Sequence, residues 1–110
     1  MTEPVLPAPI QRLVDAINTG DTEAFVASFT EDGFVDDWGR EFTDRAAIKA
    51  WSDHEFIGAN GTMDVQRVDT DGDQVVVVAD WRSTHANGLS EFTFDVDGDR
   101  IARMTIRGAD

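Results

Sequence analysis

The first part of the chain repeats its hydrophobic residues with the period of a one-sided helix. Ile10, Leu13, Val14 and Ile17 stand at i, i+3, i+4 and i+7, which predicts an amphipathic helix. Gly20 follows the pattern, and glycine readily adopts the left-handed conformation that ends many helices. The pattern therefore predicts a first helix that ends at Gly20.

A second helix is predicted immediately afterwards. Asp21 is a good N-cap, because its short carboxylate can accept hydrogen bonds from the free N–H groups of a first helical turn. Phe25, Val26 and Phe29 have helical spacing and should face inward. Gly33 is expected to end this helix.

A strand, a turn and a third helix are predicted next. Residues 34–38 indicate a short strand that turns at Gly39, and Asp36 should point away from Asp37 and be exposed. Thr43 is expected to cap the third helix, which closes at residues 58–61. The apolar face of this helix is formed by Ala47, Ile48 and Trp51.

After residue 61 the pattern changes to strands separated by turn residues. The predicted strands cover residues 62–69, 74–85, 89–96 and 100–107. Three helices followed by a mostly antiparallel meander indicate an α+β fold, with the helices packed on one face of a curved sheet. Residues 1–8 are interpreted as a flexible arm and residues 9–110 as a single domain.

An Asn-Gly pair at residues 87–88 is typical of a two-residue hairpin turn. Such a turn would place His85 opposite Ser90 and Trp81 opposite Phe94. The aromatic residues then share the face directed at the helices, and the charged residues share the other face. The alternation therefore predicts both the register of this hairpin and its orientation.

The following turn decides where the last strand lies. A three-residue loop at residues 97–99 would place Met104 beside Phe92 and Ile106 beside Ser90, on the face directed at the helices. Arg103 would then lie on the polar face.

A run of four valines at residues 75–78 breaks the alternation. Apolar residues on both faces of a strand indicate that the outer face is also covered, as a second subunit packing sheet on sheet would do. The other interpretation is that valine simply favours strands.

Composition excludes several classes of function. The chain of 110 residues carries a net charge of −13, so nucleic acids and anionic membranes are not expected partners. It holds no cysteine, which excludes disulfides and thiol nucleophiles. Nothing in the sequence resembles a signal peptide or a membrane span, and a soluble cytoplasmic protein is expected.

No motif predicts a metal or a cofactor. His54 and Glu55 do not form a zinc motif, because HExxH would need a second histidine where Gly58 stands. Residues 69–73 superficially suggest a calcium loop, but the glycine and glutamate that it requires are replaced by Gln74 and Asp80. The chain also lacks a glycine-rich phosphate loop.

Several short motifs, in this order and spacing, resemble the nuclear transport factor 2-like superfamily, in particular its SnoaL-like polyketide cyclase and ketosteroid isomerase branch. The motifs are residues 18–21, 29–32, 37–39, 46–48 and 97–101. The resemblance implies a cone-shaped roll with an apolar pocket at its open end, and a homodimer formed through the outer sheet face.

The resemblance also implies a role for Asp37, which stands where the ketosteroid isomerases of this branch have their general base. Their two oxyanion donors do not carry over. The tyrosine position falls near Leu13 in a chain without tyrosine, and the protonated aspartate position falls near Ser90. Steroid isomerisation by the usual route is therefore not expected.

We hypothesise either cofactor-free acid–base chemistry on a small hydrophobic carbonyl compound or non-catalytic binding of such a molecule. The candidate catalytic residues are Asp37 as base, His85 as a group that polarises a carbonyl, and His54 as a further candidate near the pocket mouth. The candidate ligand-binding residues are Trp38, Trp51, Phe56, Trp81, Ser90, Phe92 and Met104.

Overall fold

The computed structural model describes residues 5–109, and these form three α-helices, one short 3-10 helix and six strands. The helices are α1 (Ala8–Thr19), α2 (Thr22–Ala27), α3 (Arg45–Glu55) and the 3-10 helix η1 (Ile57–Ala59). The strands are β1 (Phe29–Asp37), β2 (Arg40–Thr43), β3 (Thr62–Asp71), β4 (Gln74–Arg82), β5 (Gly88–Asp97) and β6 (Arg100–Gly108).

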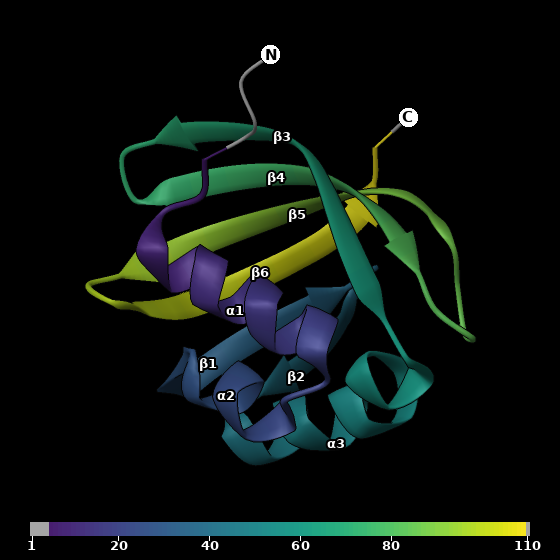
Figure 1. The fold of residues 1–110 in the computed structure, drawn as a ribbon. Coiled ribbons are helices and arrows are strands. Elements are labelled where there is room, and N and C mark those ends of the chain that lie inside the picture. The colour runs from purple at the N-terminus through teal and green to yellow at the C-terminus, as the bar shows by residue number, and fades with distance from the viewer. Residues whose placement is uncertain (1–4, 110) are drawn as a thin grey trace.

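The strands form one sheet in the order β2-β1-β6-β5-β4-β3. Every neighbouring pair is antiparallel except β1 and β6, which run parallel. The sheet is strongly curved: α1 lies across it, while α2 and α3 lie beside β1 and β2 (Figure 1). This confirms the predicted α+β fold of three helices on a curved, mostly antiparallel sheet.

The first two helices are joined as predicted. Gly20 is left-handed, with φ of 72°, and ends α1. Asp21 Oδ1 accepts a hydrogen bond from the backbone N–H of Ala24 at 3.1 Å and caps α2. Residues 1–4 of the predicted arm lie outside the described residues, whereas Leu6 packs against the core and α1 already begins at Ala8.

The predicted end of the second helix is wrong. The helix ends at Ala27, and Phe29 instead begins β1 and pairs with Ile101 of β6. Gly33 lies in a register shift of β1, where an added Cβ would come within 2.8 Å of the Phe29 Cβ. Gly33 therefore belongs to a bulge in a strand and does not end a helix.

Strand β2 was not predicted, and its presence moves the cap of the third helix. Thr43, the expected cap, is the last residue of β2 and pairs with Phe34. Asp44 takes the capping role, because its Oδ1 accepts a hydrogen bond from Ala47 N at 3.0 Å. Residues 57–60 then close the helix in a 3-10 turn that ends at a left-handed Asn60.

The predicted register of β4 and β5 is wrong by six residues. Ser90 lies opposite Ala79 rather than His85, and Phe94 lies opposite Val75 rather than Trp81. Residues 83–87 form a longer loop in place of the two-residue turn. Since six is an even number, the shift leaves the residues that remain in β4 and β5 on their predicted faces.

In the last hairpin, the side chains lie on the predicted faces of the sheet, but the turn and the strand pairing differ from the prediction. Asp97 pairs with Arg100 across a two-residue turn, and a bulge between Asp95 and Val96 then restores the alternation. Met104 and Ile106 are buried on the core face as predicted, but they lie opposite Phe94 and Phe92 rather than Phe92 and Ser90. Arg103 pairs with Asp95 on the outer face, as expected.

The core lies between the helices and the curved sheet. It includes the apolar face of α1 together with Phe25 and Phe29, and, from the sheet, Val75, Val77, Phe92 and Phe94. None of the helices within residues 5–109 has the length and apolar content that crossing a membrane requires.

Candidate functional site

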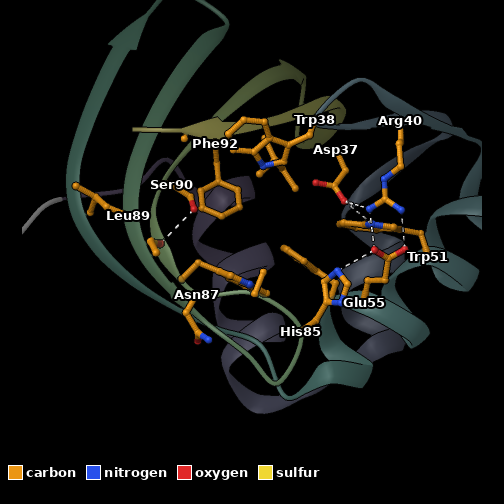
Figure 2. Close-up of a pocket in the computed structure, with 16 residues that line it drawn as sticks. Asp37, Trp38, Arg40, Trp51, Glu55, His85, Asn87, Leu89, Ser90 and Phe92 are labelled. Atoms are coloured by element: carbon orange, nitrogen blue, oxygen red, sulfur yellow. Dashed lines mark hydrogen bonds and ion pairs between the residues drawn. The ribbon is translucent and has the colours of Figure 1, made fainter. Parts of the chain in front are cut away.

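A cavity of about 500 Å³ opens between the β1–β2 turn, the end of α3 and the β4–β5 loop. This is within the size range of small-molecule sites. Asp37, Arg40 and Glu55 lie on one side of it, and Leu89, Ser90 and Phe92 lie on the opposite side (Figure 2).

The turn between β1 and β2 places Asp37 at the cavity. Asp37 ends β1, and Trp38 and Gly39 follow with φ of 55° and 89° in a tight hairpin turn. A positive φ is unusual for a residue as large as tryptophan. This turn leaves the Trp38 side chain 65% exposed at the edge of the cavity.

Helix α3 is joined to this turn by two side chains one helical turn apart. Trp51 Nε1 donates a hydrogen bond to Asp37 Oδ2 at 3.1 Å. Glu55 accepts from both terminal nitrogens of Arg40, at 3.0 and 2.7 Å. Arg40 also pairs with Asp37 Oδ2, so one guanidinium bridges two carboxylates.

These contacts favour the charged forms of Glu55 and Arg40. The hydrogen bond from Arg40 is the main reason that the pKa of Glu55 is lowered. Glu55 and then Asp37 raise the pKa of Arg40 in return. Asp37, whose side chain is 15% exposed, uses only Oδ2 in the hydrogen bonds of the described residues. Its other oxygen points into the cavity (Figure 2).

Aromatic rings form a continuous wall from α3 to the sheet. The centroids of Trp51 and Phe56 are 4.6 Å apart, and those of Phe56 and Trp81 are 4.3 Å apart with nearly parallel rings. Trp81 then meets Phe92 at 6.1 Å. Gly61 permits this packing, because an added Cβ would lie 2.2 Å from the Trp81 ring.

The β4–β5 loop brings His85 to the cavity mouth. Ser83 holds the loop in shape, since its Oγ accepts hydrogen bonds from the N–H groups of His85 and Ala86. The backbone N–H of Thr84 donates to Ala59 O at 2.9 Å and ties the loop to η1. His85 Nε2 consequently lies 3.1 Å from Glu55 Oε1.

Comparison with known proteins identifies the family. A SnoaL-like domain family model matches residues 10–108. The chain belongs to the SnoaL-like domain family. No curated protein matches the sequence of this SnoaL-like chain.

Solved structures of similar proteins agree with this assignment. A candidate polyketide cyclase from Sinorhizobium meliloti is 25% identical, with a TM-score of 0.83 over 93% of this chain and 95% of that one. A candidate ketosteroid isomerase from Kribbella flavida is 19% identical, with a TM-score of 0.77 over 90% and 73% of the two chains. A Mycobacterium tuberculosis protein solved with estradiol-17beta-hemisuccinate is 15% identical, with a TM-score of 0.79 over 89% and 88%.

Most of the side chains predicted from the sequence meet at this cavity of the SnoaL-like domain. Asp37 and His85 line it, and so do six of the seven candidate ligand-binding residues: Trp38, Trp51, Phe56, Trp81, Ser90 and Phe92. His54 is exposed on α3 and does not line it. Met104 is fully buried in the core and does not line it either.

Glu55 and Arg40 belong to the site but were not among the predicted site residues. Glu55 stands four residues after Trp51, and residues four apart share one face of a helix. That spacing could have placed Glu55 beside the cavity. Arg40 depends on β2, which the sequence pattern did not indicate.

The prediction that Asp36 is exposed is wrong. Asp36 is only 6% exposed on the outer sheet face, because Arg107 of the parallel strand β6 covers it. Arg107 donates to both carboxylate oxygens at 3.0 and 3.2 Å, and Gly39 N donates at 2.8 Å. The hydrogen bond from Arg107 is the main reason that the pKa of Asp36 is lowered.

Proposed function

We propose that this SnoaL-like domain binds a small, largely apolar carbonyl compound in the cavity and that Asp37 acts as the general base of a cofactor-free proton transfer. The observation that carries the proposal is the carboxylate of Asp37. One of its oxygens is fixed by Trp51 and Arg40, and the other points into an aromatic cavity.

The proposed reaction begins with the loss of a proton from the carbon next to the carbonyl group. The C–H bond breaks, the proton passes to the free oxygen of Asp37, and the electron pair moves onto the carbonyl oxygen as an enolate. His85 is the proposed partner of that oxygen, because it lines the same cavity. Returning the proton to the same or another carbon completes an exchange or an isomerisation.

The similar proteins support the ligand class. The Sinorhizobium protein is described as a polyketide cyclase candidate, and the Mycobacterium protein was solved with an estradiol derivative. Polyketides and steroids are both hydrophobic compounds. By extension, we propose a ligand of that kind for this cavity.

The second candidate function is binding without turnover. Arg40 and Trp51 both contact one oxygen of Asp37 in the described structure, which fixes this carboxylate in place as a hydrogen-bond acceptor. If no proton transfer occurs, Asp37 becomes the hydrogen-bond acceptor that selects the ligand.

Exchange of hydrogen for deuterium in 2-tetralone separates these functions without knowledge of the natural substrate. In D₂O, NMR would follow the loss of the α-proton signals with the wild-type protein and with Asp37→Asn. We expect the variant to lose at least about a hundredfold in rate, the usual contribution of a positioned base. Asp69→Asn, an exposed acid in the distant β3, is the matched control.

An unchanged rate in Asp37→Asn would exclude Asp37 as the base. If the wild-type protein does not accelerate the exchange but 2-tetralone still quenches its tryptophan fluorescence, the binding function is favoured.

We also propose that the protein acts in the cytoplasm as a homodimer formed through the outer face of the sheet. Val76 and Val78 point to that face, whereas Val75 and Val77 belong to the core. Val76 is flanked there by Asp69 and Thr93, and it is only partly buried within one subunit.

A further inference from the structure

The cavity combines two features that are each ordinary alone. The first is its aromatic wall, in which the faces of Trp51, Phe56 and Trp81 are stacked and Trp38 stands exposed at the edge. The π-systems of such rings carry negative charge on their faces and positive charge at their edges. Aromatic surfaces of this kind attract cations as well as apolar groups.

The second feature is an excess of negative charge at the same cavity. The ionisable residues that line it are Asp37, Glu55, Arg40 and His85. Two carboxylates face one guanidinium, which leaves one net negative charge when His85 is neutral. The excess is stable because the hydrogen bond from Arg40 lowers the pKa of Glu55 and keeps it ionised.

The positive charge of Arg40 is also poorly placed to receive an anionic ligand. Both of its terminal nitrogens are already bonded to carboxylates, to Glu55 from both and to Asp37 from one. One oxygen of Asp37, by contrast, has no partner among the described residues and points into the cavity. This oxygen of Asp37 is therefore a free acceptor at the cavity wall.

The net charge of the whole molecule also favours a cationic ligand over an anionic one. A net charge of −13 on 110 residues produces a negative field that concentrates cations near the surface and repels anions. An anionic ligand would have to approach against this field and then meet the carboxylates of Asp37 and Glu55. A cationic ligand would be attracted at both stages.

We infer that the ligand of this cavity is a hydrophobic amine, whose cationic ammonium head lies against the aromatic wall near Asp37 and Glu55. This inference rests on the proposed function in that the same cavity holds the ligand. Together the two define the substrate class as amino-carbonyl compounds, in which the cationic head fixes the molecule and the carbonyl part reacts.

Three probes of similar size and different charge test the inference by binding alone. They are choline, its neutral carbon isostere 3,3-dimethylbutan-1-ol, and the anion 3,3-dimethylbutanoate. All 3 tryptophans of the chain line the cavity, so quenching of intrinsic fluorescence reports its occupation. The titrations are done at about pH 8, where an ordinary imidazole is neutral.

We expect choline to bind at least about fivefold more tightly than the neutral isostere, which is within the range of cation–aromatic interactions. The anion should bind most weakly. Repeating the titrations at an ionic strength of about 0.15 M screens the field of the whole molecule, and the preference should persist because the cavity groups are closer to the ligand than the screening length.

A variant tests whether the preference for choline over its neutral isostere arises from the charges at the cavity. Glu55→Gln removes the excess negative charge, and the ratio of choline to isostere affinity should fall towards one. Glu31→Gln removes one charge from an exposed position on β1 and should keep the wild-type ratio. Far-ultraviolet circular dichroism shows whether each variant is folded. The comparison of the three probes on the wild-type protein does not depend on either variant.

The outcomes separate this inference from the proposed function. Equal or tighter binding of the neutral isostere would overturn the preference for amines and leave the carbonyl proposal intact. If none of the three probes quenches while 2-tetralone does, the amine inference is also overturned. Preferred binding of choline by a protein that never exchanges the protons of 2-tetralone would support the amine ligand and count against the catalytic role of Asp37.

Discussion

The indole N–H of Trp51 and the carboxylate of Asp37 are joined by a 3.1 Å hydrogen bond between α3 and β1. The bond occupies the same carboxylate oxygen that Arg40 contacts, so the other oxygen stays directed at the cavity. Trp51 thus has two roles: its ring stacks on Phe56 in the aromatic wall, and its polar atom orients the candidate base.

The first prediction concerns this bond. Trp51→Phe keeps an aromatic ring but removes the N–H donor, and we expect a loss of about 1–2 kcal/mol in the free energy of unfolding, since the lost hydrogen bond is to a charged group. Chemical denaturation measures it. Trp38→Phe, which changes an exposed ring without a hydrogen-bond partner in the described structure, should leave the midpoint nearly unchanged. Equal effects of the two substitutions would contradict the role of the bond.

The faces of the sheet could be predicted from the sequence, whereas the partners of the strands could not. Apolar alternation defines which side chains point inward, and Phe92 and Phe94 are buried as expected. The register depended on residues 87–88 forming a tight turn. Instead the Asn87 side chain accepts a hydrogen bond from Ser83 N and closes a longer loop. Competition from side-chain hydrogen bonds of this kind leaves no periodic signal.

In the candidate site, too, individual residues could be predicted from the sequence but their long-range partners could not. Asp37 was found because it stands where the ketosteroid isomerases of this family have their general base, at the end of the first strand. The tryptophans were found because they are large and apolar. The burial of Asp36 could not be found in this way, because it depends on Arg107, which is 71 residues away in the sequence and reaches Asp36 through the parallel pairing of β1 and β6. A contact between residues so far apart in the sequence can be predicted only when the order and direction of the strands are known.

The second prediction concerns the pH dependence of stability at Asp36. Arg107 lowers the pKa of Asp36 below its ordinary value of 3.8, so the folded protein holds this carboxylate ionised where the unfolded chain begins to protonate it. The contribution is complete above the unfolded pKa and is lost as pH falls through the folded pKa.

Wild-type protein and Asp36→Asn should therefore differ in unfolding free energy by a constant amount above about pH 5, and the difference should shrink below about pH 4. Denaturation at a series of pH values measures it. Asp32→Asn, at an exposed position of the same strand, is the control and should show a smaller change with pH. A difference that grows on acidification would have the wrong sign for this pair.

The third prediction concerns assembly. If the outer sheet face forms the proposed dimer, the wild-type protein should sediment as a dimer at micromolar concentration. Val76→Lys should dissociate it, because the lysine charge would be buried in the interface. Helix content should stay unchanged, since Val76 lies outside the core.

Gln11→Lys is the matched control for this substitution, because it adds the same charge to an exposed position of α1. It should sediment as the wild type does. A monomer mass for the wild-type protein across the concentration range would remove the dimer from the proposal.

The last prediction concerns Arg40, the cation shared by Asp37 and Glu55. Replacing it with methionine keeps an apolar stem of similar length but leaves the two carboxylates facing each other. Because the hydrogen bond from Arg40 is the main reason for the lowered pKa of Glu55, that pKa should rise in Arg40→Met. NMR titration of the Glu55 side-chain carboxyl carbon measures the change directly. Arg12→Met, on exposed α1 surface, should leave the Glu55 titration where it is.

The same variant changes the charge of the cavity in the direction opposite to Glu55→Gln. At about pH 8, well above the ordinary pKa of either acid, both carboxylates are expected to be ionised without a cation between them. Choline should then bind more tightly to Arg40→Met than to the wild-type protein, while 3,3-dimethylbutan-1-ol should bind equally to both. Weaker choline binding by a folded Arg40→Met protein would mean that Arg40 shapes the cavity rather than offsetting its charge.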